Sequence, residues 1–212
     1  SYEVGVKASF LNNMVNLNTS VFYYDYKDLQ VQTFETLQTT ASITITNAAE
    51  ASITGLETEF SVTPNNMFEI SGSFAYLNAE YEEFIAERAA ATPVDVKGNN
   101  LNNSPEFKVN LDIDFHHPLG QGEMSYVLSS YWQDKEYFTA FNDEITSQGS
   151  YALFDFRTSY RFANDAFEVA AFVRNIGDKE YSNASQDFSP TGVALNIMPP
   201  RTFGVEFSYQ SL

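Results

Sequence analysis

The stretch FEVAAFVRNIGDKEY, residues 167–181, decides the fold that the sequence predicts. Its first half alternates, with Val169 and Val173 on one face and Glu168 and Arg174 on the other. A period of two is typical of a β-strand whose faces meet two different surroundings. The run NIGD that follows is rich in turn residues and ends the strand. A strand that stops at a polar turn is the unit that the rest of the chain repeats.

The same alternation recurs along the whole chain and predicts about nine strands, so the fold class is all-β and antiparallel. The expected strands cover residues 2–11, 14–26, 50–62, 67–78, 107–115, 124–132, 151–162, 167–174 and 201–209.

Short and long connections alternate between these strands. The tight turns are expected near Asn12, Asn65, Leu119 and Asn164, where turn residues gather. The long connections are residues 28–49, 80–105, 133–149 and 177–200. We expect the first of them to extend a strand before it becomes a loop, and Ala86–Ala91 in the second to form one or two helical turns. One end of the sheet should therefore carry only short turns and the other only long loops.

Composition excludes several classes of protein. Acidic residues outnumber basic ones by 28 to 11, which gives a net charge of −17. Nucleic acid is therefore not an expected partner, because a phosphate backbone requires a basic face. The absence of Cys removes disulfides and thiolate metal sites. No apolar run reaches the roughly 18 residues of a transmembrane helix.

Three features favour a transmembrane β-barrel over a soluble sheet, which also alternates. The expected strands have about 9–13 residues, enough to cross a bilayer when tilted, whereas soluble strands average about five or six. One face is apolar and the other polar, as in a barrel with lipid outside and a hydrated lumen inside. Aromatic residues lie near strand ends, as in the girdles at membrane interfaces: Tyr23, Tyr26, Tyr76, Tyr81, Trp132, Tyr137, Phe162 and Tyr209.

Barrel geometry also predicts how the strands are oriented in the membrane and whether this chain contains all strands of the barrel. Open sheet edges are forbidden in hydrocarbon, and bacterial single-chain barrels have an even number of strands. An odd count, and a sequence that starts inside an expected strand, predict that N-terminal strands lie outside this chain. Short turns belong on the periplasmic side of the bacterial outer membrane and long loops outside the cell.

Several motifs resemble those of TonB-dependent outer-membrane receptors. FVRNIGDKEY at 172–181 is similar to the penultimate-strand signature of that family, and PRTFGVEFSY at 200–209 is similar to its last strand. GLETEF at 55–60, running on to YLNAEY at 76–81, resembles an earlier hairpin, and FYYDYKD at 22–28 also fits. The resemblance covers nearly the whole chain, with the motifs in the expected order.

The resemblance implies a transporter and not an enzyme, with no cofactor. Residues 1–212 would be the C-terminal part of a barrel of about 22 strands, and a plug domain would precede them. The TonB system would drive uptake through that plug. The nutrient would foremost be an iron–siderophore complex, with haem, cobalamin and oligosaccharide as alternatives.

Further partners implied by the resemblance are outer-membrane lipid and the barrel-assembly machinery. That machinery reads an aromatic residue at the C-terminus, whereas this sequence ends Tyr209-Gln210-Ser211-Leu212.

Charged side chains on inward positions are the candidate lumen residues. We expect them to form a hydrated wall or to pair with the plug, and Asp155, Arg157 and Arg161 to form an ion ladder with Arg174. Catalytic carboxylate pairs need a pocket and opposed environments, whereas these residues recur on many strands. The full lumen set is Glu57, Glu59, Asp112, Asp155, Arg157, Arg161 and Arg174.

Ligand contacts are expected in the outer loops, at aromatic residues with polar neighbours. The candidates are Tyr137, Phe138, Phe141, Asn142, Tyr181, Asn183 and Phe188. The alternative is that these residues only pack the loops together.

The remaining polar motifs are explained better by local structure than by a function. His116 and His117 are expected in the turn that follows residue 115, beside Pro118 and two Gly. Adjacent residues on a strand point to opposite faces, so the pair is not expected to chelate a metal together. Asn175 and Gly177 are expected to form the strand end and turn rather than to contact a ligand.

Two other functions stay open. One is a passive porin, which the sequence upstream of residue 1 would distinguish from a receptor. The other is a soluble β-sandwich binding module, in which the aromatic face would be a dry core between two sheets.

Overall fold

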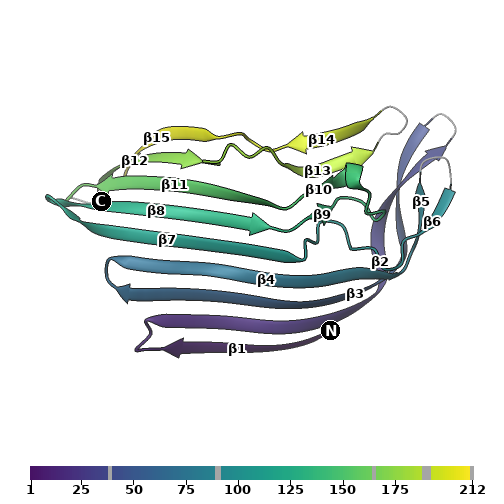
Figure 1. The fold of residues 1–212 in the computed structure, drawn as a ribbon, viewed down its shortest axis with the longest axis horizontal. Helices are drawn as coiled ribbons and strands as arrows, with labels where there is room; N and C mark the ends of the chain where they lie inside the picture. The colour runs from purple at the N-terminus through teal and green to yellow at the C-terminus, as the bar shows by residue number, and fades with distance from the viewer. Residues whose placement is uncertain (38–39, 89–91, 164–165, 188–191, 211–212) are drawn as a thin grey trace.

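In the computed structural model, the structure describes residues 1–37, 40–88, 92–163, 166–187 and 192–210. A nine-stranded antiparallel sheet contains most of the chain (Figure 1). Its strands, in spatial order, are β1 (Tyr2–Phe10), β2 (Val15–Leu37), β3 (Thr40–Asn65), β4 (Phe68–Glu83), β7 (Phe107–Leu119), β8 (Gly122–Gln133), β11 (Tyr151–Arg161), β12 (Phe167–Arg174) and β15 (Thr202–Tyr209).

Neighbouring strands in this sheet are also neighbours in sequence, so the sheet is a simple up-and-down meander. The turns after β1, β3 and β7 are short and lie together at the left of Figure 1, and the connections after β4, β8 and β12 are long and lie at the right. The predicted number of strands in the main sheet is confirmed. The predicted asymmetry of the connections holds except after β2, where paired strands replace the expected loop. The centre of the turn expected near Asn164 lies outside the described residues.

The first turn differs from the expected two-residue connection. Phe10 pairs with Val15, which leaves four residues between the strands. Leu11, Asn12 and Asn13 all have positive φ, at 52°, 57° and 67°. Asn tolerates this left-handed region better than other residues with a side chain, which explains why two Asn occupy the turn.

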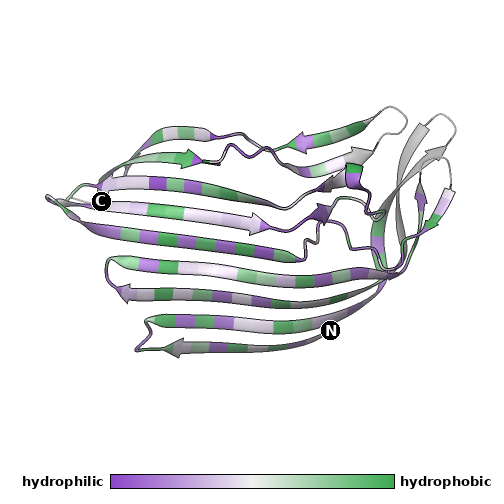
Figure 2. Cartoon of the chain, viewed as in Figure 1, coloured by the Kyte–Doolittle hydropathy of each residue, from purple (hydrophilic) through white to green (hydrophobic). Residues whose placement is uncertain are grey.

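Cross-strand register divides the sheet into two faces. Asp112 pairs with Ser71 on one side and with Ser129 on the other, and Ser129 pairs with Asp155. Directly opposite residues point to the same side, so these residues share what we call the polar face. Leu111 and the others one position along point to the opposite, apolar face. The alternation is visible along the strands in Figure 2.

Strands β2 and β3 continue far beyond their predicted ends. The sequence predicted that residues 28–49 would become a loop, whereas pairing runs on from Leu29–Ala49 to Leu37–Thr40. Two register irregularities flank Leu29, and Asp28 has a φ of 57°. A bulge of this kind bends a strand, and beyond it the hairpin turns away from the sheet (Figure 1).

The prediction of helical turns at Ala86–Ala91 is wrong for those of these residues that the structure describes. Ile85–Arg88 and Thr92–Asp95 form the antiparallel strands β5 and β6, while residues 89–91 lie outside the described part. Helix propensity of alanine is a weak preference that tertiary packing overrides. Here the packing is supplied by Phe84 and Ala86, which are both buried.

A hydrophobic cluster holds the long-loop end together. Val31 and Ala49 come from the extended hairpin, Tyr81 from the end of β4, and Phe84 from the approach to β5. The other buried members are Ala86, Val96 and Ala140. Burial raises the pKa of the Tyr81 phenol to about 12. The long connections thus share a core of their own beyond the sheet.

The remaining long connections contain short pieces of structure. These are β9 (Glu136–Tyr137), the 3-10 helix η1 (Glu144–Thr146), β10 (Ser147–Gln148), β13 (Ser182–Asp187) and β14 (Val193–Ile197). β9 pairs with β10 and β13 with β14, all antiparallel.

Some of the predicted girdle residues lie elsewhere. Tyr23 and Trp132 point to the apolar face as expected, opposite Tyr2 and Val109. Tyr26 instead continues a row of rings with Phe22 and Tyr24 on the polar face, at centroid distances of 5.2 and 6.0 Å. Tyr81 is buried in the loop cluster and Tyr137 lies in β9. Sequence position near a strand end therefore did not decide which side an aromatic ring takes.

Candidate functional site

The polar face is the first candidate for function, because charged residues there do not serve a hydrophobic core. The register places all the candidate lumen residues on this one face: Glu57, Glu59, Asp112, Asp155, Arg157, Arg161 and Arg174. Whether this face lines a lumen is a matter for the complete protein, and it stays a prediction.

An ion network joins three strands of the polar face. Arg157 Nη2 donates to Glu168 Oε1 at 2.8 Å, and Arg161 Nη2 donates to the other oxygen of Glu168 at 3.4 Å. Glu206 on β15 adds a contact of 3.5 Å to Arg157. The ion network therefore differs from the expected ladder: Arg157 and Arg161 pair with Glu168 and Glu206, whereas Asp155 and Arg174 take no part in it among the described residues. Each pair is partly exposed, so the network is expected to orient side chains more than it stabilises the fold.

The other half of the polar face is built from amides, hydroxyls and carboxylates. The Ser9 hydroxyl donates to Asn16 Oδ1 at 2.8 Å, and Asn16 Nδ2 donates to Ser61 at 3.3 Å. Asn18 Nδ2 donates to Glu59 at 3.4 Å. A cavity of about 500 Å³ lies against these residues. The surface offers many donors and acceptors to water or to a polar solute.

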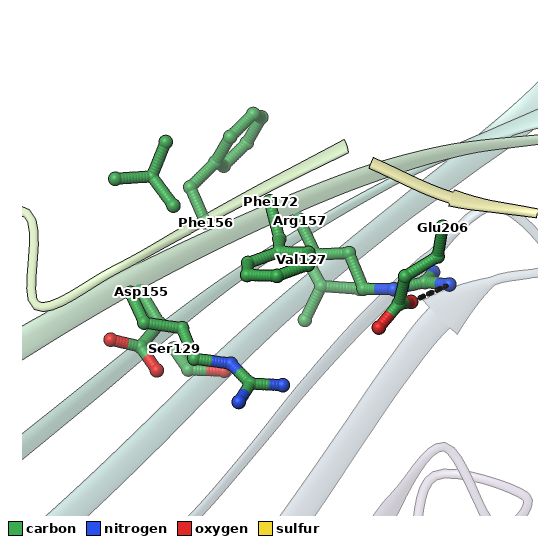
Figure 3. A pocket seen from close by; sticks show the side chains of 9 residues that line it. Val127, Ser129, Asp155, Phe156, Arg157, Phe172 and Glu206 are labelled. Atoms are coloured by element: carbon green, nitrogen blue, oxygen red, sulfur yellow. Dashed lines mark ion pairs between the residues drawn. The ribbon is translucent and has the colours of Figure 1, made fainter. Parts of the chain in front are cut away.

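A second cavity, of about 230 Å³, lies where β8, β11, β12 and β15 adjoin (Figure 3). Ser129, Asp155 and Arg157 line it together with Arg174 and Glu206. Val127 and Phe172 add apolar surface, and Phe156 and Val173 complete the lining. The Arg157–Glu206 ion pair is drawn as a dashed line at one side of the cavity in Figure 3.

Three of the seven predicted loop contacts are engaged in packing. Phe138 is buried, and Phe141 packs against the hydrophobic cluster. Asn142, with a φ of 53°, accepts a hydrogen bond from the Asn100 amide at 2.7 Å and donates one to the Asn100 carbonyl at 3.0 Å. This pair of bonds clips the two long loops to each other.

Three other predicted loop contacts have accessible surface. The Tyr137 ring lies 4.7 Å from the Lys135 ammonium, Tyr181 stacks on Tyr151 at 4.6 Å, and Asn183 accepts a hydrogen bond from Asn196. Phe188 lies outside the described residues.

A tyrosine cluster at the long-loop end of the polar face was not predicted from the sequence. Tyr151 lies between Tyr131, at a centroid distance of 5.9 Å, and Tyr181. Beside it, Gln133 Nε2 donates to Glu136 at 2.8 Å, and Gln148 Oε1 accepts from the Ser182 amide at 2.8 Å. Alternation placed Tyr131 and Tyr151 on the polar face, but only pairing of β8 with β11 brings them together.

The signature RNIGDKEY has a structural role in this fold. Asn175 is 6 % exposed, has a φ of 51°, and its amide donates to Asp155 Oδ1 at 2.8 Å. Its side chain accepts from the Lys179 amide at 2.8 Å and donates to the Lys179 carbonyl at 2.9 Å. Asp178 accepts from the Arg201 amide at 2.9 Å. These contacts close the turn after β12 and agree with the expectation that Asn175 forms the strand end.

Asn175→Ala is expected to cost about 2–3 kcal/mol in local stability, because three side-chain hydrogen bonds are lost, two with Lys179 and one with the Pro199 carbonyl, and alanine disfavours positive φ. Hydrogen exchange at the Lys179 amide should accelerate accordingly. Ile176→Ala, at a neighbouring exposed side chain, serves as the control and should leave that exchange rate unchanged. Equal exchange in both variants would contradict the structural role of Asn175.

Both histidines lie in β7 rather than in the expected turn, on opposite faces of the sheet. The described residues contain no metal-binding cluster of His, Cys, Asp and Glu. His116 Nδ1 lies 3.6 Å from Asp114 on the polar face. His117 lies on the other face beside Phe115 and Tyr126, at ring distances of 5.5 and 6.0 Å. Among the described residues there is also no helix with the length and apolarity to cross a membrane.

The chain is similar in fold to parts of much longer proteins of known structure. The chain superposes on the ferric yersiniabactin uptake receptor FyuA from Yersinia pestis with a TM-score of 0.80 and 20 % identity, covering 98 % of this chain and 29 % of that one. For the siderophore receptor PiuA from Acinetobacter baumannii the TM-score is 0.74 at 21 % identity, covering 97 % and 27 %.

The copper transporter OprC is similar as well, with a TM-score of 0.73, 16 % identity and coverage of 98 % and 31 %. At these identities the likeness shows the fold alone. The chain spans less than a third of the length of each of these proteins.

The family described as TonB dependent receptor-like, beta-barrel matches residues 1–176. That match covers most of the chain, it agrees with the nine-stranded two-faced meander, and the family consists of outer-membrane receptors that transport rather than catalyse. The chain belongs to the β-barrel domain of the TonB-dependent receptor family.

Proposed function

We propose that this chain forms part of the wall of a receptor that imports a scarce nutrient, foremost an iron–siderophore complex, with energy from the TonB system. The observation that carries the proposal is the two-faced sheet. Its apolar face suits outer-membrane lipid, and its polar face suits a hydrated lumen that a plug domain occupies. Residues 1–212 would be the C-terminal part of the barrel, with the long loops outside the cell.

The chemistry of the polar face supports an oxygen-rich, hydrated solute. Within the described strands, this face carries carboxylates, amides, hydroxyls and guanidinium groups, and no Met. Thioether and thiolate ligands are the ones that select Cu(I), and the described strands place neither on this face. Haem, cobalamin and an oligosaccharide are the other nutrients that the test below includes.

We propose that the nutrient first contacts the long loops. Tyr137, Tyr181 and Asn183 have accessible surface and are the candidates for direct contact, together with Phe188. Phe138, Phe141 and Asn142 hold the loops in shape and would act on binding indirectly.

Uptake of a ferric siderophore by cells that carry the complete receptor is expected to stop when the TonB system is deleted or the proton gradient is collapsed. The measurement is accumulation of radioactive iron from a panel of siderophores, with haem and cobalamin uptake in parallel. Cells without the receptor provide the background.

A passive porin would give the opposite result. If uptake persists without TonB and its rate rises in proportion to the external solute concentration, the protein is a passive channel and not a TonB-dependent receptor. Energy-dependent uptake of haem or cobalamin, with none of iron–siderophore complexes, would keep the transport mechanism and change the nutrient.

A further inference from the structure

We propose that the 230 Å³ cavity beside Arg174 binds a single carboxylate group. The carboxylate belongs either to the plug domain or to a solute in the lumen. The proposal concerns a site on the polar face that is separate from the loops assigned above to nutrient contact, and it goes beyond the proposed transport.

Of the two arginines that line this cavity, Arg174 is the one that no acidic side chain of the described residues pairs with. Arg157 is paired with Glu168 and Glu206. Within the described part of the chain, Arg174 has no ion pair and contacts the face of the Phe172 ring at 4.9 Å. Stacking on an aromatic face holds a guanidinium in place. Its N–H groups therefore remain available for the paired hydrogen bonds that a carboxylate accepts.

Among the described residues, the two acids of the cavity contact groups other than Arg174. Asp155 Oδ1 accepts the hydrogen bond of the Asn175 amide at 2.8 Å. Glu206 lies 3.5 Å from Arg157, on the side of the ion network. The Ser129 hydroxyl, which also lines the cavity, has no hydrogen-bond partner in the described residues and adds a donor for an incoming anion.

The size of the cavity limits what enters it. Drug-sized ligands occupy cavities of about 300–1,000 Å³, whereas this one has about 230 Å³. It therefore accommodates one acidic group of a larger partner rather than a whole iron complex. Val127 and Phe172 supply apolar surface for the carbon atoms next to that group.

The test measures whether the cavity is occupied in the complete receptor. Ser129→Cys is labelled with the neutral thiol reagent methyl methanethiosulfonate, and mass spectrometry follows the peptide that contains position 129. The rate is compared with the same variant carrying Arg174→Gln, with and without succinate. Succinamide, which has no charge, is the matched control for succinate. Lys108→Gln, which removes a positive charge elsewhere on the polar face, is the matched control for Arg174→Gln.

A carboxylate from the plug would make labelling slow, and Arg174→Gln would accelerate it roughly tenfold, since a charge-assisted hydrogen bond is lost. A carboxylate from a solute would leave labelling fast until succinate slows it, and Arg174→Gln would remove that protection. Lys108→Gln and succinamide should change neither rate. Equal rates in all backgrounds and conditions would overturn the proposal. Because no uptake is measured, this result is independent of whether the receptor proves to be TonB-dependent.

Discussion

Leu111→Arg is expected to lower the free energy of unfolding of the complete barrel by about 2–4 kcal/mol, the cost of an arginine at the midplane of the lipid-facing surface. Leu111 lies in the middle of β7, a strand of 13 residues, and its neighbours across the sheet on the apolar face are Gly72 and Ser130. Neither neighbour provides a charge for the new guanidinium. Val169→Arg on β12, opposite Phe207, should behave in the same way.

The measurement is reversible urea unfolding of the receptor in lipid vesicles, and the adjacent residue provides a matched control. Asp112→Arg introduces the same side chain one position along the same strand, but on the polar face between Ser71 and Ser129. Its cost should be much smaller, because water and carboxylates surround it. Ser159, which also points to the polar face, offers a second position of this kind. Equal costs on the two faces would refute the assignment of the apolar face to lipid.

Gly72→Val is expected to cost about 1–3 kcal/mol through overpacking of the wall. A Cβ at Gly72 would lie 2.6 Å from the carbonyl oxygen of Asn110 and 2.9 Å from Cζ of Phe60. The Phe60 ring can rotate away, but the Asn110 carbonyl belongs to the backbone of the neighbouring strand. Either β4 and β7 move apart or the valine is strained, and both outcomes weaken the pairing in the centre of the sheet.

Thermal or urea unfolding of the complete receptor measures this effect, with Gly149→Val as the control. No heavy atom lies within 4 Å of a Cβ built at Gly149, so that variant should unfold with the parent protein. A Gly72→Val receptor as stable as the control would show that the strands adjust at no cost, contrary to the close approach seen here.

Alternation along single strands was sufficient to predict the sheet. The strand containing Val169 and Glu168 was recognised because a pleated strand points successive side chains to opposite sides. That rule acts within a few residues, so strand count, the polar and apolar faces and the short turns were all accessible from the sequence. The order of motifs such as RNIGDKEY also predicted the family, and the family match confirms that prediction.

The long-loop end was predicted poorly because its structure depends on contacts between distant residues. Ala86 belongs to a β-strand since it packs in a cluster with Val31 and Ala140, and local alanine content favoured a helix instead. The β2–β3 hairpin continues past Tyr26 for the same reason: partners that lie far away in sequence bury Val31 and Ala49.

The candidate sites also have one feature that local sequence decides and one that depends on distant residues. The sequence by itself determined that Arg157, Arg161 and Arg174 share the polar face, because residue parity within a strand decides facing. Only the tertiary structure decided that Glu168 and Glu206 neutralise Arg157 while Arg174 keeps its donors free. Pairing of side chains depends on the register and spacing of separate strands, and hydrogen bonding between those strands sets both.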